Sequence, residues 1–236
     1  MRLTTVFVAT LCIMGIAHAD DPAGSFMEGP INMPSVPDAF YCQQPASNFY
    51  ANNASSGFSS EIVDDIPDEF DGRLVQAVTV YLAEWGGGFI PPVNIVVNFY
   101  DDDCPPDTSA VVSYVVPWVD VMATELQSDP SSWYVVELTV PLSEPIELGS
   151  TGSIGWYADN SSSQAPPYCG AILTDDNAVW GDCGTYWAGD YWGYPRWTAL
   201  SGYYNEVVHE LAYCLWDSEP NPVLTATWGK IKSLYK

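Results

Sequence analysis

The chain has 236 residues, and its 30 acidic residues outnumber its six lysines and arginines, so the formal net charge is −24 at pH 7. Neutralising nucleic-acid phosphates needs a basic surface, and this composition excludes that class of partner. The length suits a single β-sandwich domain, and no segment beyond the N-terminus has the ~20 apolar residues that a membrane-spanning helix requires.

The N-terminus has the form of a secretory signal peptide over residues 1–19. A short positive start precedes the mostly apolar residues 3–16, and residues 17–19 (Ala-His-Ala) form a small-x-small cleavage site. We therefore expect cleavage before Asp20 and an extracellular or cell-surface location. Cys12 offers a lipoprotein alternative, but the large residue before it does not suit that motif.

Composition divides the remaining chain into three parts. Residues 20–40 are rich in Pro, Gly and Met without periodicity, which predicts a flexible N-terminal arm. Residues 41–217 are expected to form the folded domain. A Pro-Asn-Pro break then begins a linker and a basic C-terminal tail over residues 218–236.

Strand signals dominate the central part, whereas no twelve-residue helical periodicity competes with them. Pro117 within one of these runs marks a sheet edge or a bulge. Short strands separated by regular turn clusters predict an all-β fold, a two-sheet antiparallel jelly-roll sandwich. The expected strands lie at residues 74–82, 93–100, 110–121, 133–140, 153–158 and 207–215.

Two acidic clusters, residues 61–71 and 101–107, are candidate Ca²⁺ sites, because closely spaced carboxylate oxygens suit that ion. In the second cluster the candidate ligands are Asp101, Asp103 and Asp107. It begins like an EF-hand loop, but a valine stands where the bidentate Glu should be. The alternative for both clusters is a solvated acidic turn.

Five cysteines follow the expected cleavage site, and in an exported protein they favour disulfides. We predict Cys169–Cys183 across one loop and Cys42–Cys214 between the two ends of the domain. Cys104 would then be free or linked to another molecule. No Cys-x-x-Cys is present and the mature chain has one histidine, which disfavours a zinc site.

An aromatic segment between residues 168 and 204 contains four Trp and six Tyr among turn-forming residues. Exposed rings of this kind stack on sugars, and we predict a ligand-binding role for this segment. The alternative is that the rings plug one end of the sandwich, since large aromatics dominate core burial. The candidate binding residues are Trp180, Trp187, Tyr191, Trp192, Tyr194 and Trp197.

Five short motifs follow one another along residues 55–216. They are Val-Asp-Asp-Ile-Pro (63–67), Val-Asn-Phe-Tyr-Asp-Asp-Asp-Cys-Pro-Pro (97–106), Val-Pro-Leu-Ser-Glu-Pro-Ile-Glu-Leu (140–148), Ser-Ile-Gly-Trp-Tyr-Ala (153–158) and Tyr-Trp-Gly-Tyr-Pro-Arg-Trp (191–197). In this order they resemble bacterial secreted jelly-roll domains that are similar to carbohydrate-binding sandwiches. The resemblance implies the sandwich fold and a polysaccharide or cell-surface glycan as ligand. The tail over residues 227–236 is similar to short C-terminal sorting tails of exported bacterial proteins, which implies contact with export or sorting machinery.

Catalytic motifs are scarce. A Ser-His-Asp or Cys-His site must use His209, which lies in a strand-like run and is better interpreted as structural. No Gly-x-Ser-x-Gly, His-Glu-x-x-His or Gly-x-x-x-x-Gly-Lys motif occurs. We therefore expect a secreted, noncatalytic, carbohydrate-binding module. The alternatives are a glycoside hydrolase, which needs only two suitably placed carboxylates, and a purely structural envelope protein.

Overall fold

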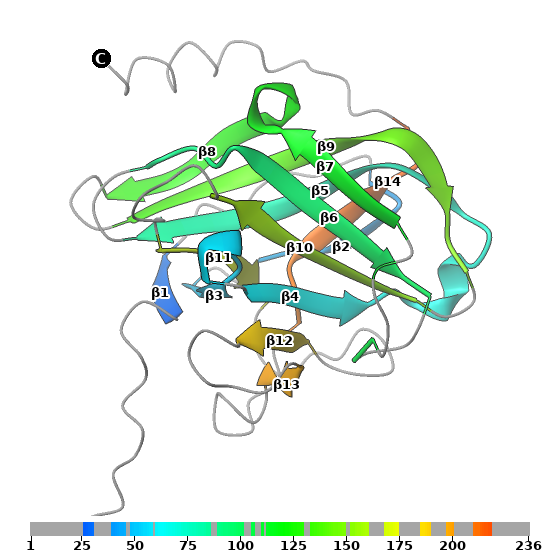
Figure 1. Ribbon diagram of the computed structural model, residues 1–236, viewed down its shortest axis with the longest axis horizontal. Helices are drawn as coiled ribbons and strands as arrows, with labels where there is room; N and C mark the ends of the chain where they lie inside the picture. The colour runs from blue at the N-terminus through cyan, green and yellow to red at the C-terminus, as the bar shows by residue number, and fades with distance from the viewer. Residues whose placement is uncertain are drawn as a thin grey trace, which may run out of the picture.

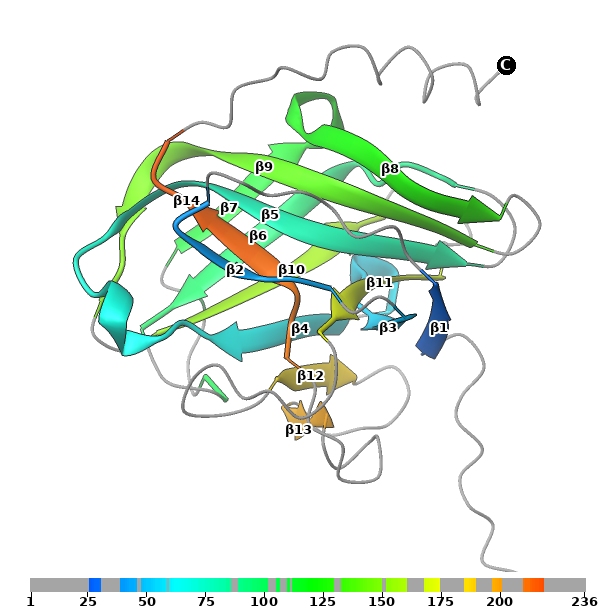
Figure 2. The ribbon, with the colours of Figure 1, turned by 180° about the vertical axis from the view of Figure 1, so that it is seen from behind.

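The computed structural model describes fourteen stretches of the chain: residues 26–30, 39–45, 48–58, 60–85, 89–101, 105–106, 110, 112–129, 133–149, 152–160, 168–174, 185–189, 197–200 and 210–218. These residues form two antiparallel sheets that pack against each other (Figures 1 and 2). The prediction of an all-β, two-sheet antiparallel sandwich is confirmed.

The described part of the first sheet has eight strands, centred on the long strand β5 (Leu74–Trp85). One edge of β5 pairs with β9 (Trp133–Glu147), which pairs in turn with β8 (Met122–Asp129). Along its other edge, β5 pairs with two strands that lie one after the other (Figure 2). The first is β11 (Tyr168–Leu173), which pairs in turn with β3 (Asn48–Asn53), and β3 pairs with β1 (Phe26–Pro30). The second is β14 (Tyr213–Trp216), which pairs in turn with β2 (Tyr41–Gln43).

The second sheet has six described strands and lies in front in Figure 1. Short 3₁₀ turns lie at Ser56–Phe58 (η1), Asp68–Phe70 (η2) and Trp118–Asp120 (η3). Strand β7 is the edge strand and ends at Pro117, as the sequence predicts for that proline. In order, the strands are β13 (Thr198–Ala199), β12 (Tyr186–Gly189), β4 (Ser60–Asp65), β10 (Ser153–Asp159), β6 (Asn94–Tyr100) and β7 (Val112–Pro117).

The core lies between the two sheets, because alternate residues of each strand point to the same face. Val80 and Leu82 of β5 meet Ile154 and Trp156 of β10 in one apolar cluster, and all four side chains are buried. Trp187 of β12 belongs to the same cluster and is fully buried.

Two sequence expectations need correction. Part of the predicted flexible arm is a strand: β1, residues 26–30, pairs in register with β3. The first acidic cluster is a solvated turn only in its second half, where Asp68 and Glu69 are exposed on η2. Its beginning forms β4, an interior strand between β12 and β10. Glu61, Asp64 and Asp65 on this strand are all buried.

One disulfide prediction is confirmed: Cys42 and Cys214 are bonded and stand opposite each other on the paired strands β2 and β14. The other pairing is not formed. Cys169 is a free, buried thiol on β11, where Asn160 Nδ2 donates to its sulfur at 3.2 Å. Its inward position between the sheets explains why it does not bridge a surface loop; Cys183 and Cys104 lie outside the described residues.

Within the described stretches, no helix has the length and apolar character to cross a membrane.

Candidate functional site: an edge groove and two buried polar clusters

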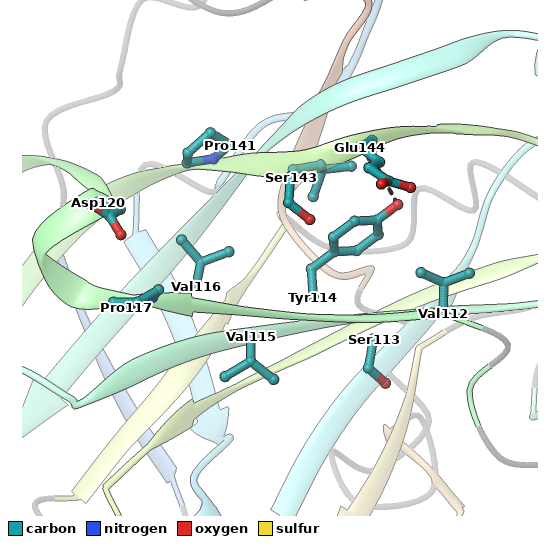
Figure 3. A pocket seen from close by; sticks show the side chains of 11 residues that line it. Val112, Ser113, Tyr114, Val115, Val116, Pro117, Asp120, Pro141, Ser143 and Glu144 are labelled. Carbon is teal, nitrogen blue, oxygen red and sulfur yellow. Dashed lines mark hydrogen bonds between the residues drawn. The ribbon is translucent and has the colours of Figure 1, made fainter.

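A surface groove runs along the open side of the sandwich, between β7 and the second half of β9 (Figure 3). Its volume is about 460 Å³. This lies within the ~300–1,000 Å³ range of small-ligand sites. The residues that line it are Val112, Ser113, Tyr114, Val115, Val116, Pro117, Asp120, Pro141, Leu142, Ser143 and Glu144.

Both walls of the groove are strand edges. Among the described strands, β7 pairs with β6 alone, and residues 141–147 of β9 pair with β5 alone. The Tyr114 hydroxyl crosses between the walls and donates to the Glu144 carbonyl oxygen at 2.9 Å. The groove therefore follows the seam where the two sheets separate.

Polar and apolar groups alternate along this seam. Ser143 points from β9 toward β7, whereas Ser113 and Val115 point away from β9, and the exposed carboxylates of Asp120 and Glu144 lie toward the two ends of the groove (Figure 3). Val115 is 60% exposed, whereas Tyr114 is only 8% exposed. The groove thus offers hydroxyl and carboxylate groups beside apolar surface, without an exposed aromatic platform among the described residues.

Of the six predicted aromatic binding residues, one is corrected by the structure and four lie outside the described residues. Trp187 is a core residue with no exposed surface, because β12 adds an inward-facing strand to the sheet. Trp197 is half-buried and packs edge-on against Tyr100, with ring centroids 6.2 Å apart. Neither ring lines the groove. The other four candidates, Trp180, Tyr191, Trp192 and Tyr194, lie outside the described residues.

The first buried polar cluster lies on the outer face of the six-stranded sheet. Glu61 Oε1 accepts hydrogen bonds from Asn98 Nδ2 at 2.7 Å and from the Tyr100 hydroxyl at 2.9 Å. Ser113 Oγ donates to Asn98 Oδ1 at 2.7 Å and continues the row across β7. Gly155 makes room for it, since a Cβ there would lie 2.6 Å from Glu61 Oε1. This row of hydrogen bonds joins β4, β6 and β7 across one face of the sheet.

The second cluster joins Asp64 and Asp65 of β4 to Glu210, which precedes β14. One oxygen from each of these buried carboxyls lies within 4.8 Å of the others. Asp64 Oδ2 accepts from the Leu211 backbone N–H at 2.7 Å and from Thr185 Oγ1 at 3.1 Å. Burial, and the neighbouring Glu210 carboxyl, raise the pKa of Asp64 well above its ordinary value. Burial likewise raises the pKa of Glu210.

Cys169 is the free thiol of the described residues, and its surroundings do not suit a nucleophile. Burial raises its pKa to about 12, so the reactive thiolate is scarce at neutral pH. Glu84, opposite Cys169 on β5, also has a raised pKa, about 8, because it is buried.

The predicted second calcium cluster is only partly in view. Asp101 is exposed at the end of β6, and Asp103 and Asp107 lie outside the described residues. Sequence reasoning included Asp64 and Asp65 in its first acidic cluster but missed Glu210, which is 146 positions from Asp64 in the sequence (210 − 64).

Comparison with known proteins finds no matching family model, no matching curated protein and no matching solved structure.

Proposed function

We propose that the chain is a secreted, noncatalytic β-sandwich module that binds an extended carbohydrate in the groove between β7 and β9. The groove itself carries this proposal: it is a long, open hollow of about 460 Å³ that runs along a seam rather than closing around a compact ligand. The predicted signal peptide and the acidic composition support a place outside the cell. The resemblance to carbohydrate-binding sandwiches favours the same ligand class.

The lining suits a polyhydroxylated chain. Carboxylates accept hydrogen bonds from sugar hydroxyls, and the exposed hydroxyl of Ser143 can both donate and accept. Pro117 and Pro141 add rigid apolar surface for the C–H faces of a sugar ring. Pocket sites of this kind combine apolar surface with a few placed polar groups.

Prolines on both walls disfavour an added peptide strand as the ligand. Pro117 ends β7, and Pro141 and Pro145 stand on the part of β9 that lacks a second described neighbour. Proline has no N–H for a ladder, and its presence on an edge protects a sheet from strand addition. A glycan needs no regular ladder of backbone hydrogen bonds and tolerates these prolines.

The spacing of the groove carboxylates favours binding over hydrolysis. Glu144 adjoins Tyr114, and Asp120 lies beyond Pro117 at the far end (Figure 3). The three residue steps from Tyr114 to Pro117 alone span about 10 Å of strand. Glycosidase carboxyl pairs are separated by about 5–9.5 Å. Asp120 and Glu144 therefore do not suit the two catalytic positions.

A glycan array probed with the whole chain tests the proposal. The array ligand that binds is then titrated against Ser143→Trp, which fills the groove from an exposed position, and against Glu69→Trp, which places the same bulk on η2. We expect Ser143→Trp to weaken binding by about tenfold or more and Glu69→Trp to leave it unchanged. Absence of any bound glycan, or equal binding by the two variants, would overturn the proposal.

A further inference from the structure

We propose that Asp64, Asp65 and Glu210 form a binding site for a hard divalent cation, with Ca²⁺ as the best-fitting ion, which ties the two sheets together at the interior of the sandwich. This site is distinct from the groove and does not depend on carbohydrate binding. It takes two ligands, Asp64 and Asp65, from the first sequence-predicted acidic cluster and differs from the second cluster, at Asp101.

The unsatisfied state of Glu210 is the first argument. Its side chain has no exposed surface, and both carboxylate oxygens lack a hydrogen-bond partner. The backbone is held in place: Thr174 N donates to the Glu210 carbonyl oxygen at 2.8 Å, and Glu210 N donates to Thr174 Oγ1 at 3.2 Å. An isolated buried carboxylate is strongly unfavourable unless it is paired or coordinates a metal.

The neighbouring carboxyl, Asp64, is already solvated by protein donors. Asp65 N donates to Oδ1 at 3.0 Å, while Leu211 N and Thr185 Oγ1 donate to Oδ2. Protein donors therefore point at both oxygens of Asp64, whereas none of the described residues donates to the Glu210 carboxyl. A cation between the two groups would give Glu210 the positive partner that no protein donor supplies.

The geometry suits calcium. One oxygen of each carboxyl lies within 4.8 Å of the others. Ca²⁺ binds oxygens at about 2.3–2.6 Å, so oxygens up to about 5.2 Å apart can share one ion, and this cluster lies within that limit. Mg²⁺ demands near-ideal octahedral geometry and usually keeps several waters, which a buried cluster of three carboxyls suits less well.

The position of the cluster gives such an ion a structural role. Asp64 and Asp65 belong to β4 of the six-stranded sheet, and Glu210 precedes β14 of the eight-stranded sheet. The Tyr213 hydroxyl donates to the Asp65 carbonyl oxygen at 2.9 Å across the same junction. A bound cation would therefore add a second link between the sheets where hydrogen bonds already join them.

Metal binding to the whole chain, freed of metal by a chelator and dialysed, tests the inference. Bound Ca²⁺ is measured by elemental mass spectrometry, bound Tb³⁺ by luminescence excited through the protein, and stability by thermal unfolding with added Ca²⁺ or Mg²⁺. We expect one Ca²⁺ per chain at this site. Each tenfold rise in Ca²⁺ above the dissociation constant should raise the melting temperature by about 3–6 °C.

Matched variants assign the ion to its ligands. Glu210→Gln keeps the shape of the side chain and should weaken Ca²⁺ binding at least about tenfold, which reduces the thermal shift at a saturating Ca²⁺ concentration by about 3–6 °C or more. Glu84→Gln, at another buried glutamate, and Asp101→Asn, in the other acidic cluster, should retain it. Loss on Asp101→Asn with retention on Glu210→Gln would overturn the assignment.

Two further outcomes count against the cation. If no Ca²⁺ binds to the wild-type chain and its melting temperature does not respond to the ion, a proton rather than a metal joins Asp64 and Glu210. If Glu210→Gln does not fold, Ca²⁺ affinity is measured on Glu210→Asp and Tb³⁺ luminescence on the wild-type chain. An unchanged Ca²⁺ affinity in Glu210→Asp, together with no Tb³⁺ luminescence from the wild-type chain, would reject the site.

Discussion

Replacing Glu84 with Gln should make the protein more stable at alkaline pH while leaving its stability at acid pH nearly unchanged. Glu84 lies near the end of β5 on the inward face, in register with Cys169 on β11 and Tyr134 on β9. It is 2% exposed, and both its oxygens accept a hydrogen bond from the Ile90 backbone N–H, at 2.8 and 3.0 Å. Gln preserves an acceptor for Ile90 and cannot ionise.

The magnitude follows from the pKa. Burial raises the pKa of Glu84 from 4.5 to about 8, while the Ile90 hydrogen bond opposes part of that rise. Between these two values the folded chain binds more protons than the unfolded chain, so stability falls as pH rises. The contribution is fully present below pH 4.5 and lost above pH 8. At about 1.4 kcal/mol per pKa unit, the whole change is at most about 5 kcal/mol.

Urea unfolding followed by tryptophan fluorescence at pH 4.5, 6 and 8 measures the effect on the whole, disulfide-bonded chain. The other buried acids titrate in both proteins, so the difference between wild type and Glu84→Gln isolates Glu84. We expect that difference to grow in favour of the variant by a few kcal/mol from pH 4.5 to pH 8. Glu69→Gln, on the exposed turn η2, should stay within about 0.5 kcal/mol of wild type throughout.

Parallel pH profiles for wild type and Glu84→Gln would refute the reasoning, because they would mean that Glu84 ionises in the folded chain as easily as in the unfolded one. A variant that loses more stability at pH 8 than at pH 4.5 would refute it as well. That result would mean that Glu84 is ionised in the folded chain and that the hydrogen bond from Ile90 stabilises the ionised form.

Three further substitutions test the packing. Replacing both Cys42 and Cys214 with Ala opens a bridge across 172 residues and should lower the free energy of unfolding by about 2–5 kcal/mol in urea, whereas equal stability would show that the bridge is not formed in solution. Trp187→Ala should cost about 3–5 kcal/mol, and a loss under about 1 kcal/mol would place the ring at the surface. Gly155→Ala should lower the free energy of unfolding by about 1–3 kcal/mol, because the added Cβ would displace the Glu61 side chain. The loss should be smaller in a Glu61→Ala background, and an equal loss there would exclude the clash.

Sequence reasoning succeeded where strands carry their apolar pattern in full. The runs at residues 74–82, 93–100 and 153–158 appear as β5, β6 and β10 with small changes at their ends. Local alternation was sufficient for these strands because their inward residues bury against the opposite sheet. The groove could not be predicted in this way, since its walls at β7 and β9 meet only when the two sheets pack.

Strand β4 shows why the buried acidic residues could not be predicted from the sequence. Its sequence, Ser-Glu-Ile-Val-Asp-Asp, contains three acids in six residues, which indicates an exposed turn. The acids are buried because their partners arrive from distant parts of the chain: Asn98 lies 37 positions from Glu61, and Leu211 lies 147 positions from Asp64. No local sequence pattern predicts those hydrogen-bond donors.

The acids of β4 point to both faces of its sheet, and this explains the placement of the aromatic residues as well. Glu61 lies on the face opposite Ile62 and joins the row under Tyr100, against which Trp197 packs. Asp64 lies on the face of Ile62, beside the chain that leads into β14. Acidic side chains on both faces of β4 must be enclosed on both faces. On the core side, β12 pairs with β4 and its Trp187 packs in the core beside it. The described part of the aromatic segment, which the sequence suggested as a ligand platform, therefore serves to enclose the acidic strand.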